Sequence, residues 1–192
     1  MAAPRNLWFT IRADGEVFSK ASHRPMTPEL IKNLVLGFFA VLVIVAALKD
    51  LSSFIIPNWI SATLALGFVP AALMVHAPLG DIGISFAVGA GVFVLAASMF
   101  AFGWIGGGDA KLMTAAALWV GLKGLAPFAL YTGLAGGALA LALVALRTAW
   151  IRPFAEAGPA WARRLATPGE AAPYGVAIAV GALAAFAAHP LV

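Results

Sequence analysis

The stretch NLVLGFFAVLVIVAALK, Asn33–Lys49, decides the fold class. Its interior contains no charged side chain, and an apolar run of this length is typical of a transmembrane helix. The whole chain has the same character, because 62% of its 192 residues are hydrophobic and only 10% are charged. Its mean hydropathy is +0.97. These values predict an integral membrane protein and not a soluble domain.

Further apolar runs follow, and glycine, proline or charged residues separate them. The expected spans are Asn33–Lys49, Asn58–Val75, Ile82–Phe102, Asp109–Val120, Pro127–Leu146 and Tyr174–Ala188. The pattern predicts an all-α integral membrane protein with about six transmembrane helices.

The expected organisation is a polar N-terminal tail, residues 1–32, followed by one six-helix membrane domain, residues 33–192. A polar loop at 147–173 interrupts the domain and is expected to lie partly as an amphipathic segment at the membrane surface. Most tryptophans fall near predicted span ends, which is typical of the interfacial aromatic belt. The six tryptophans of the chain are Trp8, Trp59, Trp104, Trp119, Trp150 and Trp161.

Charged and metal-binding residues restrict the possible partners. Lys and Arg outnumber Asp and Glu by 12 to 8, but they gather in loops and at helix ends, which favours the lipid bilayer and not nucleic acid as the partner. The absence of cysteine excludes disulfides and thiolate chemistry. The three histidines, His23, His76 and His189, have no metal-site spacing, so we expect no metal site.

The aspartates are placed by counting membrane crossings. Asp50 follows the first span and Asp109 follows the third, so two crossings separate them and they share one side of the membrane. Asp81 follows the second span and is expected on the opposite side. Basic residues near span ends in short loops favour the side of Asp50 and Asp109 as the cytoplasmic one.

Two segments carry candidate chemistry. Gly106-Gly107-Gly108-Asp109-Ala110-Lys111 puts a carboxylate behind three residues without side chains, which permit unusual dihedrals and a close approach of substrate. An alternative is a flexible turn in which Asp109 only caps a helix. Lys49–Asn58 supplies a second carboxylate at Asp50, for which the alternative is a surface Lys-Asp pair.

Together these segments predict a catalytic pair. Two neighbouring carboxylates can share a proton, so that one acts as a base toward water and the other donates to a carbonyl oxygen. Asp50 ends one helix and Asp109 starts another, and the helix dipole disfavours negative charge only at the first of these positions. On this argument we expect the shared proton mainly on Asp50.

The motifs resemble those of the type IV prepilin peptidases, the bacterial GxGD aspartyl proteases. The similar elements are Asp50 with Ile56-Pro57-Asn58, then Gly106–Lys111, then Pro173-Tyr174-Gly175. Without cysteines or a cysteine-rich insert, the chain looks most like the short branch that serves tight-adherence (Flp) pili. It departs from many relatives in having Ser52, Ser53 and Phe54 where they have basic residues.

The resemblance implies a multi-pass protein of the bacterial inner membrane that removes a short basic leader from prepilins or pseudopilins. Cleavage would follow a glycine at the cytoplasmic face, without N-methylation. The implied catalytic residues are Asp50 and Asp109, and the resemblance implies no metal or organic cofactor. Residues implied to shape the site or bind substrate are Pro57, Asn58, Gly106, Gly108 and Lys111.

A small ion- or proton-coupled carrier is the alternative function, in which the same aspartates bind cations or relay protons. Such a carrier predicts polar residues in the middle of helices, and the first three spans contain few of them. It also gives no role to the Pro-Asn and Gly-rich segments at helix ends.

Overall fold

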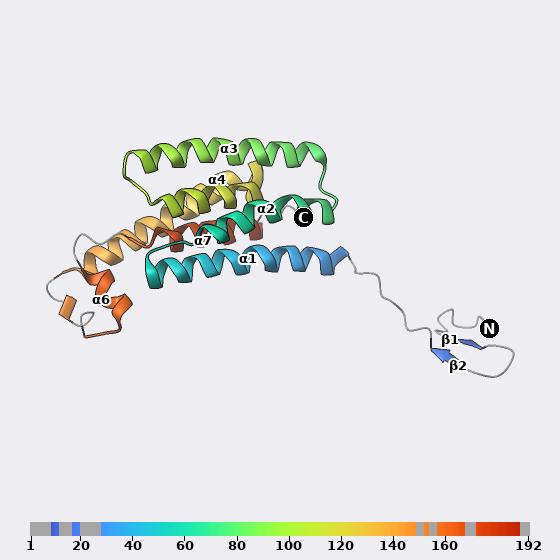
Figure 1. Cartoon of the computed structure of the whole chain (residues 1–192), viewed down its shortest axis with the longest axis horizontal. Helices are drawn as coiled ribbons and strands as arrows, with labels where there is room; N and C mark the ends of the chain where they lie inside the picture. The colour runs from blue at the N-terminus through green and yellow to red at the C-terminus, as the bar shows by residue number, and fades with distance from the viewer. Residues whose placement is uncertain are drawn as a thin grey trace.

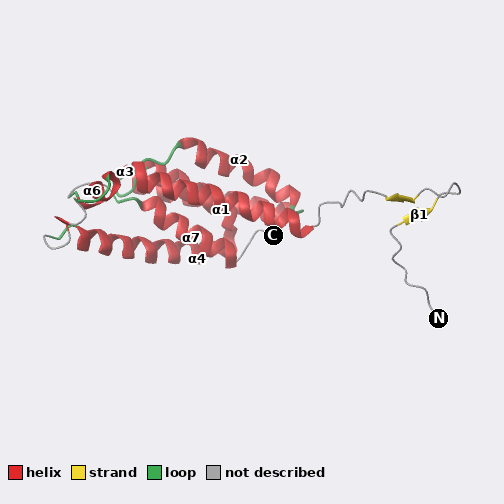
Figure 2. Cartoon of the chain, turned by 90° about the horizontal axis from the view of Figure 1, so that it is seen from below, coloured by secondary structure: helices red, strands yellow, loops and turns green. Residues whose placement is uncertain are grey.

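The computed structural model describes residues 9–11, 17–19, 28–148, 152–153, 157–167 and 172–188. Its membrane part is all-helical, as predicted (Figures 1 and 2). The helices are α1 (Pro28–Ser53), α2 (Asn58–Met74), α3 (Leu79–Ala101), α4 (Gly107–Leu146), α6 (Ala160–Ala166) and α7 (Tyr174–Ala188).

Helix α4 corresponds to the fourth and fifth predicted spans. It is broken at Gly121, whose φ of 58° and ψ of −165° are not helical. Both ends of α4 lie at the α6 end of the bundle, so the chain turns back at this break (Figure 1). The predicted link Gly121–Ala126 is wrong in extent, because a single glycine makes the turn and the helix resumes directly after it.

The outer surface of the bundle is apolar. Helices α1, α3 and α4 are long and apolar enough to cross a membrane, and α2 and α7 are shorter apolar helices. Large side chains point away from the protein interior, among them Leu66 at 77% exposure and Leu141 at 74%. Because so much exposed apolar surface is unfavourable in water, these faces are suited to lipid.

Aromatic side chains from four helices meet in the core. Phe39 of α1, Phe68 of α2 and Phe186 of α7 all pack against Trp119 of α4. The Trp119 side chain is fully buried, and its indole Nε1 donates a hydrogen bond of 2.9 Å to the carbonyl of Leu64. The expectation that Trp119 belongs to the interfacial belt is therefore wrong, because this residue fills the centre of the bundle.

The predicted tail and polar loop are described only in part, and Trp8 and Trp150 lie outside the described residues. Within the tail, β1 (Phe9–Ile11) and β2 (Val17–Ser19) pair in antiparallel fashion, which the sequence did not predict. Helix α1 begins at Pro28, inside the range expected for the tail. In the polar loop, α6 is amphipathic, because Trp161 is exposed and Leu165 is buried.

The connections between helices separate the two ends of the bundle. The α1–α2 and α3–α4 connections lie at the end where α6 packs, and the α2–α3 connection lies at the other end (Figure 1). Asp50 and Asp109 therefore lie at one end, as the crossing count predicts. Asp81, in the first turn of α3, lies at the opposite end.

Candidate active site

Asp50 occupies the last turn of α1 and is 5% exposed. The helix ends after Ser53 because Phe54 adopts a left-handed conformation with φ of 57°, which is uncommon for a residue other than glycine. The backbone N–H of Phe54 donates to the carbonyl of Asp50 over 2.8 Å and closes the final turn. The hydroxyl of Ser53 donates to the carbonyl of Lys49 over 2.7 Å. These bonds satisfy carbonyls that a helix end otherwise leaves free.

A second element holds the Asp50 carboxylate. The backbone N–H of Gly175, the second residue of α7, donates a hydrogen bond of 2.6 Å to Asp50 Oδ2. Asp50 therefore lies at the N-terminus of α7 as well as at the C-terminus of α1, and a helix N-terminus favours negative charge. The sequence predicts the shared proton on Asp50 from the end of α1 alone, and it does not show that the N-terminus of α7 also lies beside this carboxylate.

Asp109 is the third residue of α4 and is 9% exposed. Its Oδ2 accepts a hydrogen bond of 3.2 Å from the N–H of Gly106, the residue that precedes the helix. Among the described residues, its other oxygen, Oδ1, is buried and has no hydrogen-bond partner. Asp109 is therefore not the N-cap that the alternative expected, because Gly106 holds that position. One of its two oxygens instead accepts the N–H of the N-cap residue from inside the first turn.

The three glycines before Asp109 are not equivalent. A Cβ at Gly106 would lie 3.0 Å from Asp109 Oδ2, and one at Gly108 would lie 3.1 Å from the Cβ of Ile56. A Cβ at Gly107 would meet only the edge of the Phe100 ring, at an ordinary distance of 3.4 Å. Gly106 therefore allows the residue before α4 to lie against the Asp109 carboxylate, and Gly108 allows the first turn of α4 to lie against Ile56 in the loop after Asp50. The middle position, Gly107, is less restricted.

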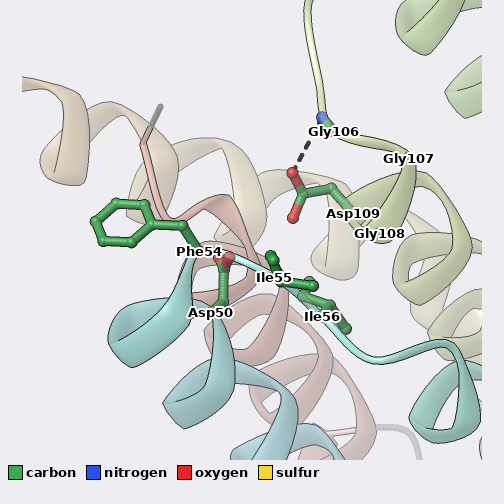
Figure 3. Close-up of a pocket in the computed structure, with 8 residues that line it drawn as sticks. All are labelled: Asp50, Phe54, Ile55, Ile56, Gly106, Gly107, Gly108 and Asp109. Atoms are coloured by element: carbon green, nitrogen blue, oxygen red, sulfur yellow. Dashed lines mark hydrogen bonds between the residues drawn. The ribbon is translucent and has the colours of Figure 1, made fainter. Parts of the chain in front are cut away.

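Both aspartates line one pocket of about 230 Å³. Figure 3 shows the two aspartates reaching it from different helices, with Phe54, Ile55 and Ile56 of the α1–α2 loop beside Asp50. The lining residues are Asp50, Phe54, Ile55, Ile56, Gly106, Gly107, Gly108 and Asp109. The pocket therefore offers two carboxylates in a setting otherwise made of backbone and apolar side chains.

The remaining predicted residues lie at the same end of the bundle. Lys111 Nζ donates a hydrogen bond of 2.8 Å to Asn58 Oδ1, which joins the first turns of α4 and α2. Pro57 immediately precedes α2, and its carbonyl accepts a 3.1 Å hydrogen bond from the N–H of Ile60. Of the seven predicted site residues, Asp50, Gly106, Gly108 and Asp109 line the pocket, whereas Pro57, Asn58 and Lys111 lie at the same end of the bundle and are not among its lining residues. Lys111 contacts the first residue of α2 and not only its own segment.

Two features of the site were not predicted as such. Gly175 was noted only as part of the Pro173-Tyr174-Gly175 element, yet it contacts Asp50 directly. The Arg164 guanidinium of α6 lies 4.7 Å from the centre of the Phe54 ring, a cation–π contact at the pocket lining. Within the part of the chain that the structure describes, no group of three or more acidic or histidine side chains could hold a metal ion.

Comparison with known proteins agrees with this arrangement. Residues 37–141 match the model of the type IV leader peptidase family, and this segment includes both aspartates. Searches against curated proteins and against solved structures found no match. Since the matched segment covers more than half of the chain, the chain belongs to the type IV leader peptidase family.

Proposed function

We propose that this protein is a membrane-embedded aspartyl endopeptidase that uses Asp50 and Asp109 as its catalytic pair. The observation that carries the proposal is the pocket that both buried aspartates line. Family membership supports a leader peptidase, and the geometry supports the aspartic mechanism. Family membership does not distinguish the aspartic type, so the pair itself is the point to test.

The proposed reaction needs one ionised and one protonated carboxyl group. The ionised carboxylate takes a proton from water while the water oxygen bonds to the scissile carbonyl carbon. The protonated partner donates a hydrogen bond to the carbonyl oxygen as negative charge develops there. Collapse of the tetrahedral intermediate breaks the C–N bond, and a proton passes to the departing amine. Asp109 Oδ1 is buried and has no hydrogen-bond partner among the described residues, so a water or substrate atom that enters the pocket would complete its hydrogen bonding.

The proposed substrates are prepilins and pseudopilins of the Flp type. Cleavage would remove the short basic leader after a glycine, immediately before the mature hydrophobic helix, at the cytoplasmic face of the bacterial inner membrane. The absence of cysteine throughout the chain supports membership of the short branch, for which we propose cleavage without N-methylation.

The decisive experiment is co-expression of the full chain with a precursor that has a basic leader, a glycine and a hydrophobic helix. We expect a mobility shift that Asp50→Ala and Asp109→Ala each abolish. Asp81→Ala is the matched control, because this aspartate is exposed and lies at the other end of the bundle. Continued cleavage by either active-site variant would refute the catalytic pair.

Mass spectrometry of the mature product separates the branches. We expect an unmodified N-terminal amine at the residue after the glycine. A product that carries an added methyl group, made by this protein alone, would contradict the assignment to a branch without methylation.

A further inference from the structure

The N-terminus of α7 meets the proposed active site at a position that the reaction scheme above does not use. Gly175 lies 125 residues from Asp50 in the sequence, and its N–H bonds the Asp50 carboxylate in a buried setting. The family match ends at residue 141, so it does not include this contact. We propose that Gly175 is a positioning residue, which fixes the Asp50 carboxylate through its backbone N–H and acts through that residue in catalysis.

Gly175 is closely surrounded by side chains of the proposed site. A Cβ at this position would lie 2.8 Å from Asp50 Oδ2 and 2.8 Å from Ile56 Cδ1. At both distances something must shift, so a larger residue at this position would displace the Asp50 carboxylate, the Ile56 side chain or the α7 backbone. Ile56 also lines the pocket, so Gly175 contacts the site at two points.

Helix α7 is held firmly against α4 near the hydrogen bond between Gly175 and Asp50. Tyr174 packs against Gly136 of α4, where a Cβ would lie 2.5 Å from the tyrosine hydroxyl oxygen. Further along α7, a Cβ at Gly181 would clash with Thr132 Oγ1. These close approaches of small residues are typical of tightly packed membrane helices. They fix α7 against α4, so the N–H of Gly175 has a defined position relative to Asp50.

The hydrogen bond from Gly175 also stabilises the negative charge of Asp50. Asp50 ends α1, where nearby carbonyls disfavour a carboxylate, and a single backbone N–H from another helix offsets this. The bond occupies one oxygen of Asp50, just as the bond from Gly106 occupies one oxygen of Asp109. Each aspartate is therefore held by a glycine N–H that adds no side chain to the pocket.

The inference rests on the proposed function, and its test has a part that needs no substrate. Replacing the Gly175 amide by an ester through semisynthesis of the full chain removes the N–H without adding an atom. The infrared carboxyl band assigned to Asp50, by difference from Asp50→Asn, is expected to shift in the ester variant in detergent micelles. A band identical to that of the unmodified protein would overturn the inference, whether or not the protein cleaves pilin precursors.

The kinetic part uses the precursor described above. We expect the ester to lower kcat about 10- to 100-fold, in line with the loss of a hydrogen bond to a charged group, with KM nearly unchanged. Gly175→Ala is expected to lower kcat at least as far, and Gly175→Ala combined with Ile56→Val is not expected to regain it, because the clash with Asp50 remains.

Gly137→Ala is the matched control, because a Cβ there meets nothing within 4 Å. Thermal unfolding of each variant shows whether the fold is retained. A folded ester variant with unchanged kcat would overturn the inference, whereas inactivity of the unmodified protein toward the precursor would count against the proposed function alone.

Discussion

The GxGD pattern has a simple steric basis in this protein. A Cβ at either outer glycine, Gly106 or Gly108, would make a tight contact of 3.0 or 3.1 Å, whereas one at Gly107 would make only ordinary contacts. The pattern therefore records two close approaches, one to the Asp109 carboxylate and one to Ile56 in the α1–α2 loop. The second of these brings the segments of the two aspartates together.

Gly108→Ala is expected to reduce cleavage about 10-fold, because its Cβ would lie 3.1 Å from that of Ile56 and push the α4 start away from the loop. Steady-state cleavage of the precursor measures the effect. Gly133→Ala in the same helix is the control, since a Cβ there meets nothing within 4 Å. Equal activity of the two variants would show that this approach does not matter for catalysis.

At the scale of elements, the predicted helices exist, but their ends differ from the prediction. The first span was expected to end at Lys49, yet α1 continues to Ser53 and carries Asp50 in its last turn. The charged pair at Lys49-Asp50 suggested an end, but the hydroxyls of Ser52 and Ser53 donate to the Lys49 carbonyl and support another turn. Local composition places a membrane helix well, whereas its last turn depends on hydrogen bonds that composition does not show.

The break in α4 is the element most dependent on one residue. Gly121 has a φ of 58°, and a Cβ there would lie 3.1 Å from Ser85 Oγ of α3. Gly121→Ala is expected to lower the free energy of unfolding by about 1–3 kcal/mol, since the left-handed backbone is strained for any larger residue. Thermal unfolding in detergent micelles measures it as a lower Tm. Gly137→Ala, beyond the break in an open position, should keep the original Tm.

At the scale of the whole molecule, the crossing count alone brought Asp50 and Asp109 to one end of the bundle, because each span reverses the direction of the chain. The count could not show which helices pack together. Trp119 therefore looked interfacial, although it lies at the centre of the core. Likewise, nothing in the sequence shows that the start of α7 reaches Asp50, because such a contact depends on how α7 packs against α4.

The same topology predicts which connections face each side of the membrane. The chain contains no cysteine, so single cysteines can be introduced without background labelling. Ser52→Cys and Trp104→Cys, both at exposed positions in or near connections at the active-site end, should be inaccessible to a membrane-impermeant thiol reagent in intact cells. They should react once the membrane is opened.

His76→Cys tests the opposite end, because His76 is exposed in the α2–α3 connection. It should react in intact cells, since an odd number of crossings separates it from the active-site end. Each variant is first checked for cleavage of the precursor, so that labelling is read from folded protein. The reverse pattern would place the active site outside the cytoplasm, where an unprocessed leader that remains on the cytoplasmic side could not reach it. Labelling of all three positions from one side would contradict the crossing count itself, and with it the placement of Asp50 and Asp109 at a single membrane face.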